Sequence, residues 1–166
     1  SKDKPIRELL PKGELVYPLS QHIGAPATPI VAVGDTVLKG QKIAEAGGFV
    51  SAPIHASVSG TVKKIEPRRV PTGDMVNSIV IESDGEFKEV EYQAVEDVSA
   101  LSKEEIVNRI KEAGVVGMGG AGFPTHVKLS PKEPEKIDYI IANCAECEPY
   151  LTSDYRIMLD HTEELV

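Results

Sequence analysis

Two stretches of alternating apolar residues, each broken by turn residues, constrain the first half of the chain more than any other feature. Residues 29–44 carry apolar residues on both sides of Gly34-Asp35, a dipeptide that is typical of a tight turn between two strands. Residues 49–65 contain two more short strand patterns, one on each side of Ser59-Gly60. Successive patterns of this kind predict a compact barrel built from hairpins.

This half resembles the biotinyl and lipoyl carrier domains, the barrel-sandwich hybrids. Their pattern runs Val-x-x-Gly-Asp-x-Val-x-x-Gly-Gln, then an exposed hairpin, then Ala-Pro-x-x-Gly-x-Val. Residues 31–41 and 52–62 match the two parts, the second with a two-residue insertion before the glycine. Carriers hold their cofactor on a lysine at the hairpin tip, but this sequence has no lysine between Lys42 and Lys63. We therefore expect no covalent biotin or lipoate, and a domain that docks the protein on a partner or covers a neighbouring site.

The charge balance and the cysteines limit the partners and the location. The chain has 26 acidic and 18 basic residues, which argues against nucleic acid as a partner because phosphate binding requires a clustered positive surface. No apolar run approaches the roughly 18 residues of a membrane span, so we expect membrane association only through a partner protein. Two cysteines are too few to staple a secreted fold, which favours a cytosolic protein. His22 and His55 are expected to be packing or turn residues rather than ligands.

A helical pattern begins the second half of the chain. Ser102 and Glu105 have the spacing of a capping box, in which each side chain bonds to the backbone N–H of the other residue. Apolar residues at helical spacing follow, and Gly114 is a typical residue for closing a helix. We predict a helix over 103–113.

A glycine cluster follows this helix. Five glycines fall within residues 114–122, which is costly in backbone entropy for a simple connector. A loop of this kind lets backbone amides approach a phosphate or a flat ring, and Lys128 can add a positive charge. A connector without a ligand stays open as an alternative, because the known dinucleotide fingerprint follows a strand and this loop follows a helix.

The next apolar run, 137–143, has the pattern of a buried strand of a parallel sheet. The motif Asn-Cys-Ala-Glu-Cys-Glu-Pro starts at its last residue, and sites of open α/β sheets lie at the carboxyl ends of strands. Amide and carboxylate groups there can bind ring N–H or ribose hydroxyl groups, although an exposed acidic loop is also possible. The two thiols, Cys144 and Cys147, cannot close a four-ligand metal site alone. An amphipathic helix is expected from Asp154 to Val166.

The glycine loop and the Asn-to-Pro motif together resemble the flavoprotein subunit of respiratory complex I. In that family, Gly-Arg-Gly-Gly-Ala-Gly-Phe-Pro-Thr-Gly-x-Lys-Trp and Asn-Ala-Asp-Glu-Ser-Glu-Pro bind FMN and NADH. The chain resembles the RnfC family of the Rnf electron-transport complex more closely, through segments 18–26, 49–60, 117–129 and 146–154 in the same order. This resemblance implies a mixed fold with two domains. A β-rich barrel-sandwich hybrid would span 1–95, and the N-terminal part of an FMN/NADH-binding α/β domain would span 96–166.

The resemblance also implies cofactor-binding residues, and no catalytic or metal-binding ones. Two side chains of the complex I patterns are changed, because Met118 replaces an arginine and Ala145 an aspartate. Cys144 stands where we expect glycine in this family. The implied residues are Gly117, Gly119, Gly120 and Gly122 around the flavin, Lys128, Asn143 and Glu146 at FMN, and Phe123 and Glu148 at NADH.

The activity implied by the resemblance is electron transfer from NADH through FMN to iron–sulfur clusters, coupled to ferredoxin and to ion movement across a membrane. The protein would lie on the inner face of the cell membrane, held by other subunits. The cysteines that bind clusters in the family are not in these 166 residues, so we expect an N-terminal fragment that is inactive alone. Two alternatives stay open: a flavoprotein of the cobalamin-reductase type, and a docking module whose glycine loop holds no cofactor.

Overall fold

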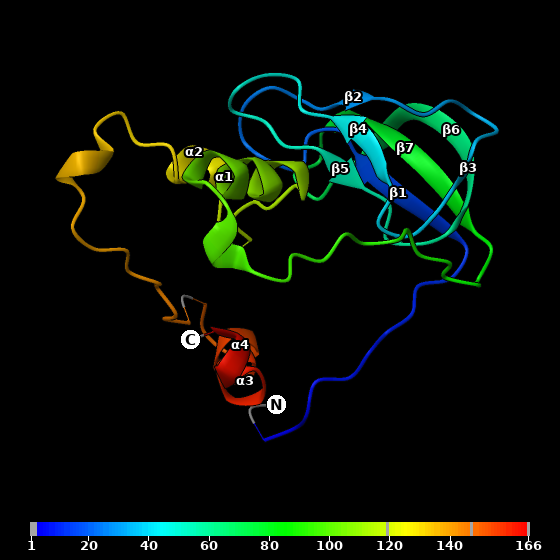
Figure 1. Ribbon diagram of the computed structural model, residues 1–166. Helices are drawn as coiled ribbons and strands as arrows, with labels where there is room; N and C mark the ends of the chain where they lie inside the picture. The colour runs from blue at the N-terminus through cyan, green and yellow to red at the C-terminus, as the bar shows by residue number, and fades with distance from the viewer. Residues whose placement is uncertain (1–2, 119, 147, 166) are drawn as a thin grey trace. The chain divides into compact units, whose positions relative to one another are not determined.

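The structure, a computed structural model, describes residues 3–118, 120–146 and 148–165 of the chain. The chain folds as two compact units, and each is described by itself. The larger unit is Pro11–Lys132, and the smaller unit combines the first ten residues with the segment that begins at Glu133. The larger unit contains the predicted barrel, the predicted helix and the glycine loop, so these three are placed relative to one another (Figure 1).

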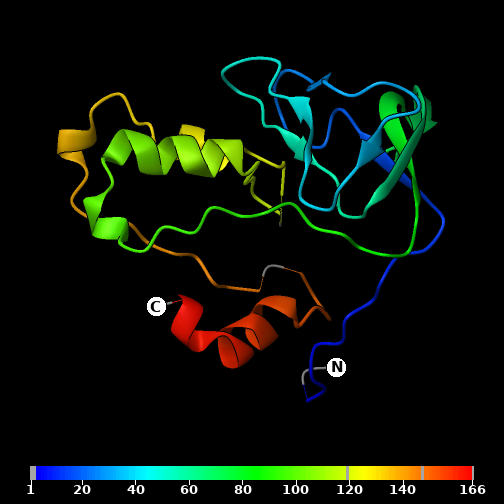
Figure 2. The same ribbon diagram turned by 45° about the vertical axis from the view of Figure 1, so that its right-hand side comes forward.

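The barrel consists of two antiparallel sheets (Figures 1 and 2). The four-stranded sheet has the order β1-β7-β6-β3, and the three-stranded sheet has the order β2-β4-β5. The predicted barrel-sandwich hybrid is therefore confirmed. The strands are β1 (Glu14–Pro18), β2 (Thr28–Pro29), β3 (Thr36–Val37), β4 (Lys42–Glu45), β5 (Ile54–His55), β6 (Gly60–Arg69) and β7 (Met75–Ser83).

The turn predicted at Ser59-Gly60 is wrong by two residues. The chain bends at Ser57 and Val58, and Gly60 is already the first residue of β6. A Cβ atom at Gly60 would lie 2.0 Å from the carbonyl oxygen of Glu82 on the neighbouring strand. This glycine is therefore required by the close approach of two backbones rather than by a turn.

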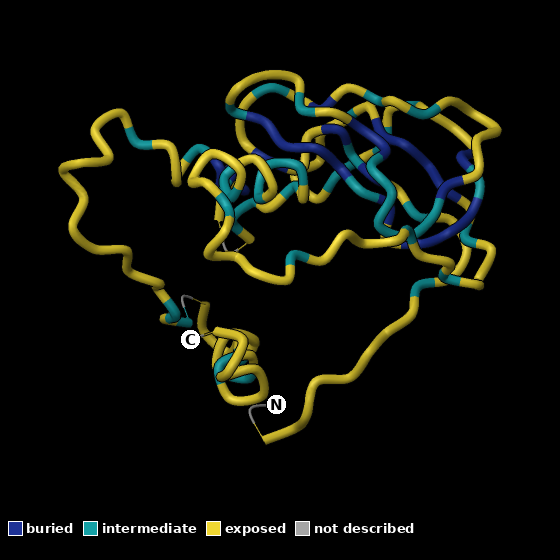
Figure 3. The backbone as a smooth tube through the Cα atoms, in the orientation of Figure 1, coloured by how far each residue is buried: buried dark blue, intermediate teal, exposed yellow. Residues whose placement is uncertain are grey.

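The core lies between the two sheets and is almost entirely aliphatic. Figure 3 shows the buried segments gathered in the barrel strands. One polar contact borders the core, a hydrogen bond of 2.8 Å between the hydroxyl oxygens of Tyr17 and Ser57. The buried cluster contains Tyr17, Leu19, Ala27, Val37, Ile43, Ala44, Ile54, Ala56, Val58, Val62, Ile79 and Ile81.

We predict that Ile79→Ala lowers the free energy of unfolding of the larger unit by about 2–5 kcal/mol. Ile79 is fully buried on β7 between β1 and β6, so the truncation removes buried methyl groups and leaves a cavity. Ile30→Ala is the matched control, because the Ile30 side chain is 52% exposed. Urea unfolding measures both variants, and equal losses would contradict the placement of the core.

The helix predicted over 103–113 is confirmed as α1 (Lys103–Glu112). The Ser102 side chain accepts a hydrogen bond from the Glu105 N–H at 3.2 Å, and the Glu105 carboxylate accepts one from the Ser102 N–H at 2.8 Å. These bonds satisfy two N–H groups that the start of a helix leaves without partners. The glycine expected after the helix, Gly114, has a φ of +68°. The short 3-10 helix η1 (Val98–Ala100) precedes α1.

An ion pair joins the end of α1 to the barrel. The Lys42 ammonium on β4 donates to the Glu112 carboxylate, and this hydrogen bond raises the pKa of Lys42 and lowers the pKa of Glu112. His55 lies nearby on β5, and its partial burial lowers its pKa. Both side chains of the pair keep some contact with water, so its effect on stability is modest.

We predict that Glu112→Gln destabilises the larger unit by less than about 1 kcal/mol at neutral pH. The contribution of the pair is complete between the ordinary pKa values of 4.5 and 10.5. It is lost as the pH falls through the lowered pKa of Glu112, or rises through the raised pKa of Lys42. Thermal unfolding between pH 7 and pH 3 should show the difference from the parent chain vanish in acid. The control Glu91→Gln, at an exposed position, should follow the parent chain at every pH.

The smaller unit contains the 3-10 helix η2 (Pro134–Lys136) and the helices α3 (Ser153–Asp160) and α4 (Thr162–Leu165). The helix expected from Asp154 onward is therefore present as two pieces, with a break at His161. In the described part of the chain, no helix has the length and apolar character that a membrane crossing requires.

The buried strand predicted over 137–143 is wrong in this structure. The segment has no strand pairing, and the side chains of Tyr139, Ile140 and Ile141 are between 84% and 87% exposed. A strand of a parallel sheet is held by neighbouring strands on its edges. Among the described residues, both sheets lie in the barrel and neither includes this segment.

Candidate functional site

The glycine loop is closed at its neck by backbone contacts. The Gly117 N–H donates to the Phe123 carbonyl oxygen at 2.9 Å, and the Thr125 N–H donates to the Val115 carbonyl oxygen at 3.0 Å. Val116 and Pro124 form an antiparallel bridge beside these bonds. The short helix α2 (Thr125–Lys128) follows immediately. The loop between Gly117 and Phe123 therefore leaves and re-enters the fold at fixed points.

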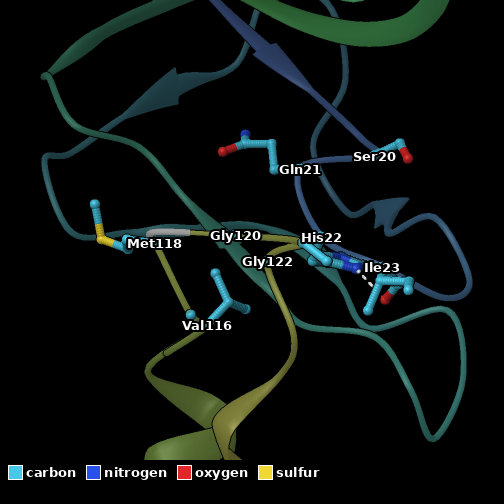
Figure 4. A pocket seen from close by; sticks show the side chains of 10 residues that line it. Ser20, Gln21, His22, Ile23, Val116, Met118, Gly120 and Gly122 are labelled. Atoms are coloured by element: carbon cyan, nitrogen blue, oxygen red, sulfur yellow. Dashed lines mark hydrogen bonds between the residues drawn. The ribbon is translucent and has the colours of Figure 1, made fainter. Parts of the chain in front are cut away.

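A pocket of about 550 Å³ lies between this loop and the barrel (Figure 4). Its volume is in the range of small-molecule and cofactor sites. One wall is the barrel segment between β1 and β2, residues 20–23, and the other is the glycine loop. The lining residues are Ser20, Gln21, His22, Ile23, Val116, Gly117, Met118, Gly120, Ala121 and Gly122.

His22 holds the barrel wall in place. Its Nε2 accepts a hydrogen bond from the Ala52 N–H at 3.2 Å, and its Nδ1 lies 3.2 Å from the Ile23 carbonyl oxygen. A carbonyl oxygen can only accept, so Nδ1 carries the proton and both nitrogens are engaged. His22 is buried, and it is a packing residue as expected from the sequence. Its ring has no nitrogen left for a ligand.

The glycines of the loop have different surroundings. Gly122 has a φ of +64°, and a Cβ there would lie 3.0 Å from the Gln21 carbonyl oxygen and 3.1 Å from the His22 Cα. Gly114 likewise approaches the barrel, with its Cβ position 2.6 Å from the Pro53 carbonyl oxygen. A Cβ at Gly120 would meet nothing within 4 Å. Gly122 and Gly114 are thus required by the barrel, whereas Gly120 faces open space.

A second contact joins the barrel hairpin to α2. The His126 Nε2 donates to the Phe49 carbonyl oxygen at 3.1 Å, and the two rings meet edge to face with centroids 6.1 Å apart. The His126 side chain is buried. Its Nδ1 has no hydrogen-bond partner among the described residues.

Lys128, at the end of α2, brings a positive charge to the loop. A Cβ at Gly117 would lie 3.0 Å from the Lys128 Nζ, so the ammonium group lies beside the loop backbone. No ion pair or hydrogen bond joins this ammonium group to any residue that the structure describes. Phe123 is 36% exposed, and its carbonyl oxygen closes the loop neck. Gly119, the remaining predicted glycine, lies outside the described residues.

The other predicted site residues belong to the smaller unit. Asn143 is exposed, and its Oδ1 accepts from the Ala145 N–H at 3.1 Å. Glu146 caps α3, because its Oε2 accepts from the N–H groups of Asp154 and Tyr155 at 3.0 and 3.3 Å. A carboxylate is favoured at a helix N-terminus, where the N–H groups lack partners. Glu148 is exposed. The nucleotide contacts of these three residues stay predictions.

The cysteine pair is described only in part. Cys144 has a free thiol, and Cys147 lies outside the described residues. No group of three His, Cys, Asp or Glu side chains that could hold a metal ion occurs among the residues that are described.

Sequence reasoning missed the barrel wall of the pocket. The local pattern gives residues 20–23 no site role, although they lie inside the segment 18–26 on which the family resemblance partly rests. That matching segment was the available signal. Nothing in the pattern says that it faces a loop about 100 residues further along the chain, because only the tertiary fold brings them together.

Comparison with known proteins places these features in families. The profile of the RnfC barrel sandwich hybrid domain matches residues 1–86, and the profile of the Nuo51 FMN-binding domain matches residues 110–166. The domain boundary predicted at 95/96 lies between the two matches and stays a prediction.

Three relatives illustrate the similarity, and each is the C component of its complex. The chain is 49% identical to that of the Na⁺-translocating ferredoxin:NAD⁺ oxidoreductase complex of Acetobacterium woodii, over 92% of this chain and 34% of the relative. It is 49% identical to that of the proton-translocating ferredoxin:NAD⁺ oxidoreductase complex of Clostridium ljungdahlii, over 99% and 36%. It is 38% identical to that of an ion-translocating oxidoreductase complex of Haemophilus influenzae, over 100% and 26%. The chain therefore spans about a quarter to a third of the length of these relatives.

The fold and the matches define a barrel-sandwich hybrid that is followed by the start of an FMN-binding domain. The matching hybrid domain is the RnfC one, and it covers more than half of the sequence. The chain belongs to the RnfC family, as the resemblance in the sequence implied.

We predict that Gly122→Ala weakens the packing of the loop on the barrel. An alanine at positive φ costs about 1–2 kcal/mol, and its Cβ would also crowd the backbone of residues 21 and 22. Hydrogen exchange should show faster exchange of the Ile23 N–H, which donates to the Gly122 carbonyl oxygen at 3.3 Å. Gly120→Ala is the control, since its Cβ meets open space at an ordinary φ. Equal exchange in the two variants would contradict this assignment.

Proposed function

We propose that this chain is the N-terminal, FMN-binding part of a subunit that passes electrons between NADH and iron–sulfur clusters. The surrounding membrane complex would couple this transfer to ferredoxin and to ion translocation, as the names of the relatives state for those proteins. The observation that carries the proposal is the pocket of about 550 Å³ between the glycine loop and the barrel, within a chain whose residues 110–166 match an FMN-binding domain.

The chain's own residues fit FMN at this pocket. The loop presents a glycine backbone, and the open space at Gly120 lets a flat ring or a phosphate come close. The Lys128 ammonium beside Gly117 has no partner among the described residues, so it is available to an anion. A phosphate next to it would gain a charge-assisted hydrogen bond.

Bound FMN supplies hydride acceptance from NADH and release of single electrons. The residues around it bind and orient rather than donate or remove protons, because both nitrogens of the one histidine that lines the pocket are engaged. Gly117, Gly119, Gly120 and Gly122 would surround the flavin, with Lys128, Asn143 and Glu146 at FMN. Phe123 and Glu148 would help to seat NADH. Such positioning lowers a barrier by holding reactants in the reactive geometry.

The partners follow from the same proposal. The relatives are components of ion-translocating complexes, so other subunits of a membrane complex are the expected partners, and ferredoxin is an indirect one. The protein would lie on the inner face of the cell membrane through these contacts. Iron–sulfur clusters would bind in the region of the relatives that this chain does not match.

We predict that Lys128→Gln weakens FMN binding roughly ten- to a hundredfold, the loss that one charge-assisted hydrogen bond implies. Quenching of flavin fluorescence measures binding to this chain and to the chain extended to the length of its relatives. Lys63→Gln is the control, because Lys63 is exposed on β6 of the barrel. Lys128 is a sharper probe than Glu146, whose removal would also uncap α3.

No FMN binding by a well-folded extended chain would refute the proposal. The docking-module alternative would then account for the glycine loop, since Gly114 and Gly122 already have a structural reason in their contacts with the barrel.

A further inference from the structure

The barrel wall of the pocket supplies chemistry that the glycine loop lacks. The loop residues that line the pocket are glycine, alanine, valine and methionine, so this wall has no polar side chain. Gly119, which lies outside the described residues, could add none because glycine has no side chain. The barrel wall adds Ser20, Gln21 and His22.

Of these three side chains, only two are free for a ligand. Both ring nitrogens of His22 are engaged with the backbone of residues 23 and 52. Ser20 and Gln21 are exposed, and no hydrogen bond joins either side chain to another residue that the structure describes. A carboxamide both donates and accepts, which suits the mixed N–H and carbonyl edge of a flavin ring.

The wall that carries Gln21 is held against the loop. The Ile23 N–H donates to the Gly122 carbonyl oxygen, and the backbone of residues 21 and 22 lies against the Cβ position of Gly122. Figure 4 shows the Gln21 and His22 side chains at one wall, with Met118, Gly120 and Gly122 at the other. Gln21 is therefore kept at the rim of the pocket by the backbone contacts of its own segment, rather than carried on a mobile tail.

We propose that Gln21 of the barrel, with Ser20 beside it, hydrogen-bonds the ring of the flavin in this pocket, so that the barrel-sandwich hybrid is part of the cofactor site. This inference rests on the proposed FMN function and assigns the polar contacts of the ring to the barrel. The glycine loop then provides the close backbone approach, and Lys128 provides the charge for the phosphate.

The test compares FMN with riboflavin, which has the ring but no phosphate, in the chain extended to the length of its relatives. Gln21→Leu removes the carboxamide at similar volume, and it should weaken both ligands by about the same factor, roughly tenfold for one neutral hydrogen bond. Lys128→Gln should weaken FMN and leave riboflavin nearly unchanged. Gln21→Leu should also shift the absorption bands of bound FMN, since the contact is with the ring.

Gln93→Leu is the matched control, because Gln93 is exposed in the segment between β7 and η1, and it should bind both ligands like the parent chain. Unchanged affinity and an unchanged flavin spectrum for Gln21→Leu, with normal binding by the parent chain, would overturn this inference and leave the FMN function intact. Failure of the parent chain to bind either flavin would overturn both. An unfolding midpoint for Gln21→Leu equal to that of Gln93→Leu separates a lost contact from a lost fold.

Discussion

The close approach of the loop backbone to the barrel is the contact on which the pocket depends. At Gly122 and Gly114, the carbonyl oxygens of Gln21 and Pro53 occupy the space that a Cβ would need. Two walls can face each other at this distance only because neither side places a side chain between them. The lining of the pocket is consequently backbone on the loop side and side chains on the barrel side, and the polar groups come from a domain outside the glycine motif.

This arrangement gives the glycines of the cluster two separate physical reasons. Gly122 and Gly114 have positive φ values and touch the barrel, so they are explained by folding alone. Gly120 has neither property, because its Cβ position is open, and the fold does not explain it. A residue without a structural reason in an expensive loop is the stronger indication of a ligand. The cofactor hypothesis therefore rests on Gly120 and Lys128 more than on the number of glycines.

The sequence predicted what is decided locally. The helix begins where the capping box of Ser102 and Glu105 places it, because both bonds lie within four residues. The barrel followed from turn residues between short strands, although the chain bends two residues before Ser59-Gly60. The segment 137–143 was mistaken for a buried strand, since apolar composition cannot supply the neighbouring strands that a parallel sheet requires. The barrel wall at 20–23 could not be assigned either, because its partner lies in another part of the sequence.

The hairpin that carriers use to move a cofactor is fixed in place in this protein. The Ser51 hydroxyl donates to the Ala25 carbonyl oxygen at 2.8 Å and accepts from the Gly47 N–H at 2.9 Å, which ties the hairpin to the barrel. On its other side, the Phe49 carbonyl oxygen accepts from His126 on α2. A tip held on both sides cannot visit distant sites, so the missing lysine and the fixed tip are consistent with each other. The same topology that delivers a cofactor in carriers can here stiffen the pocket, and a binding site requires that rigidity to hold its contacts in register.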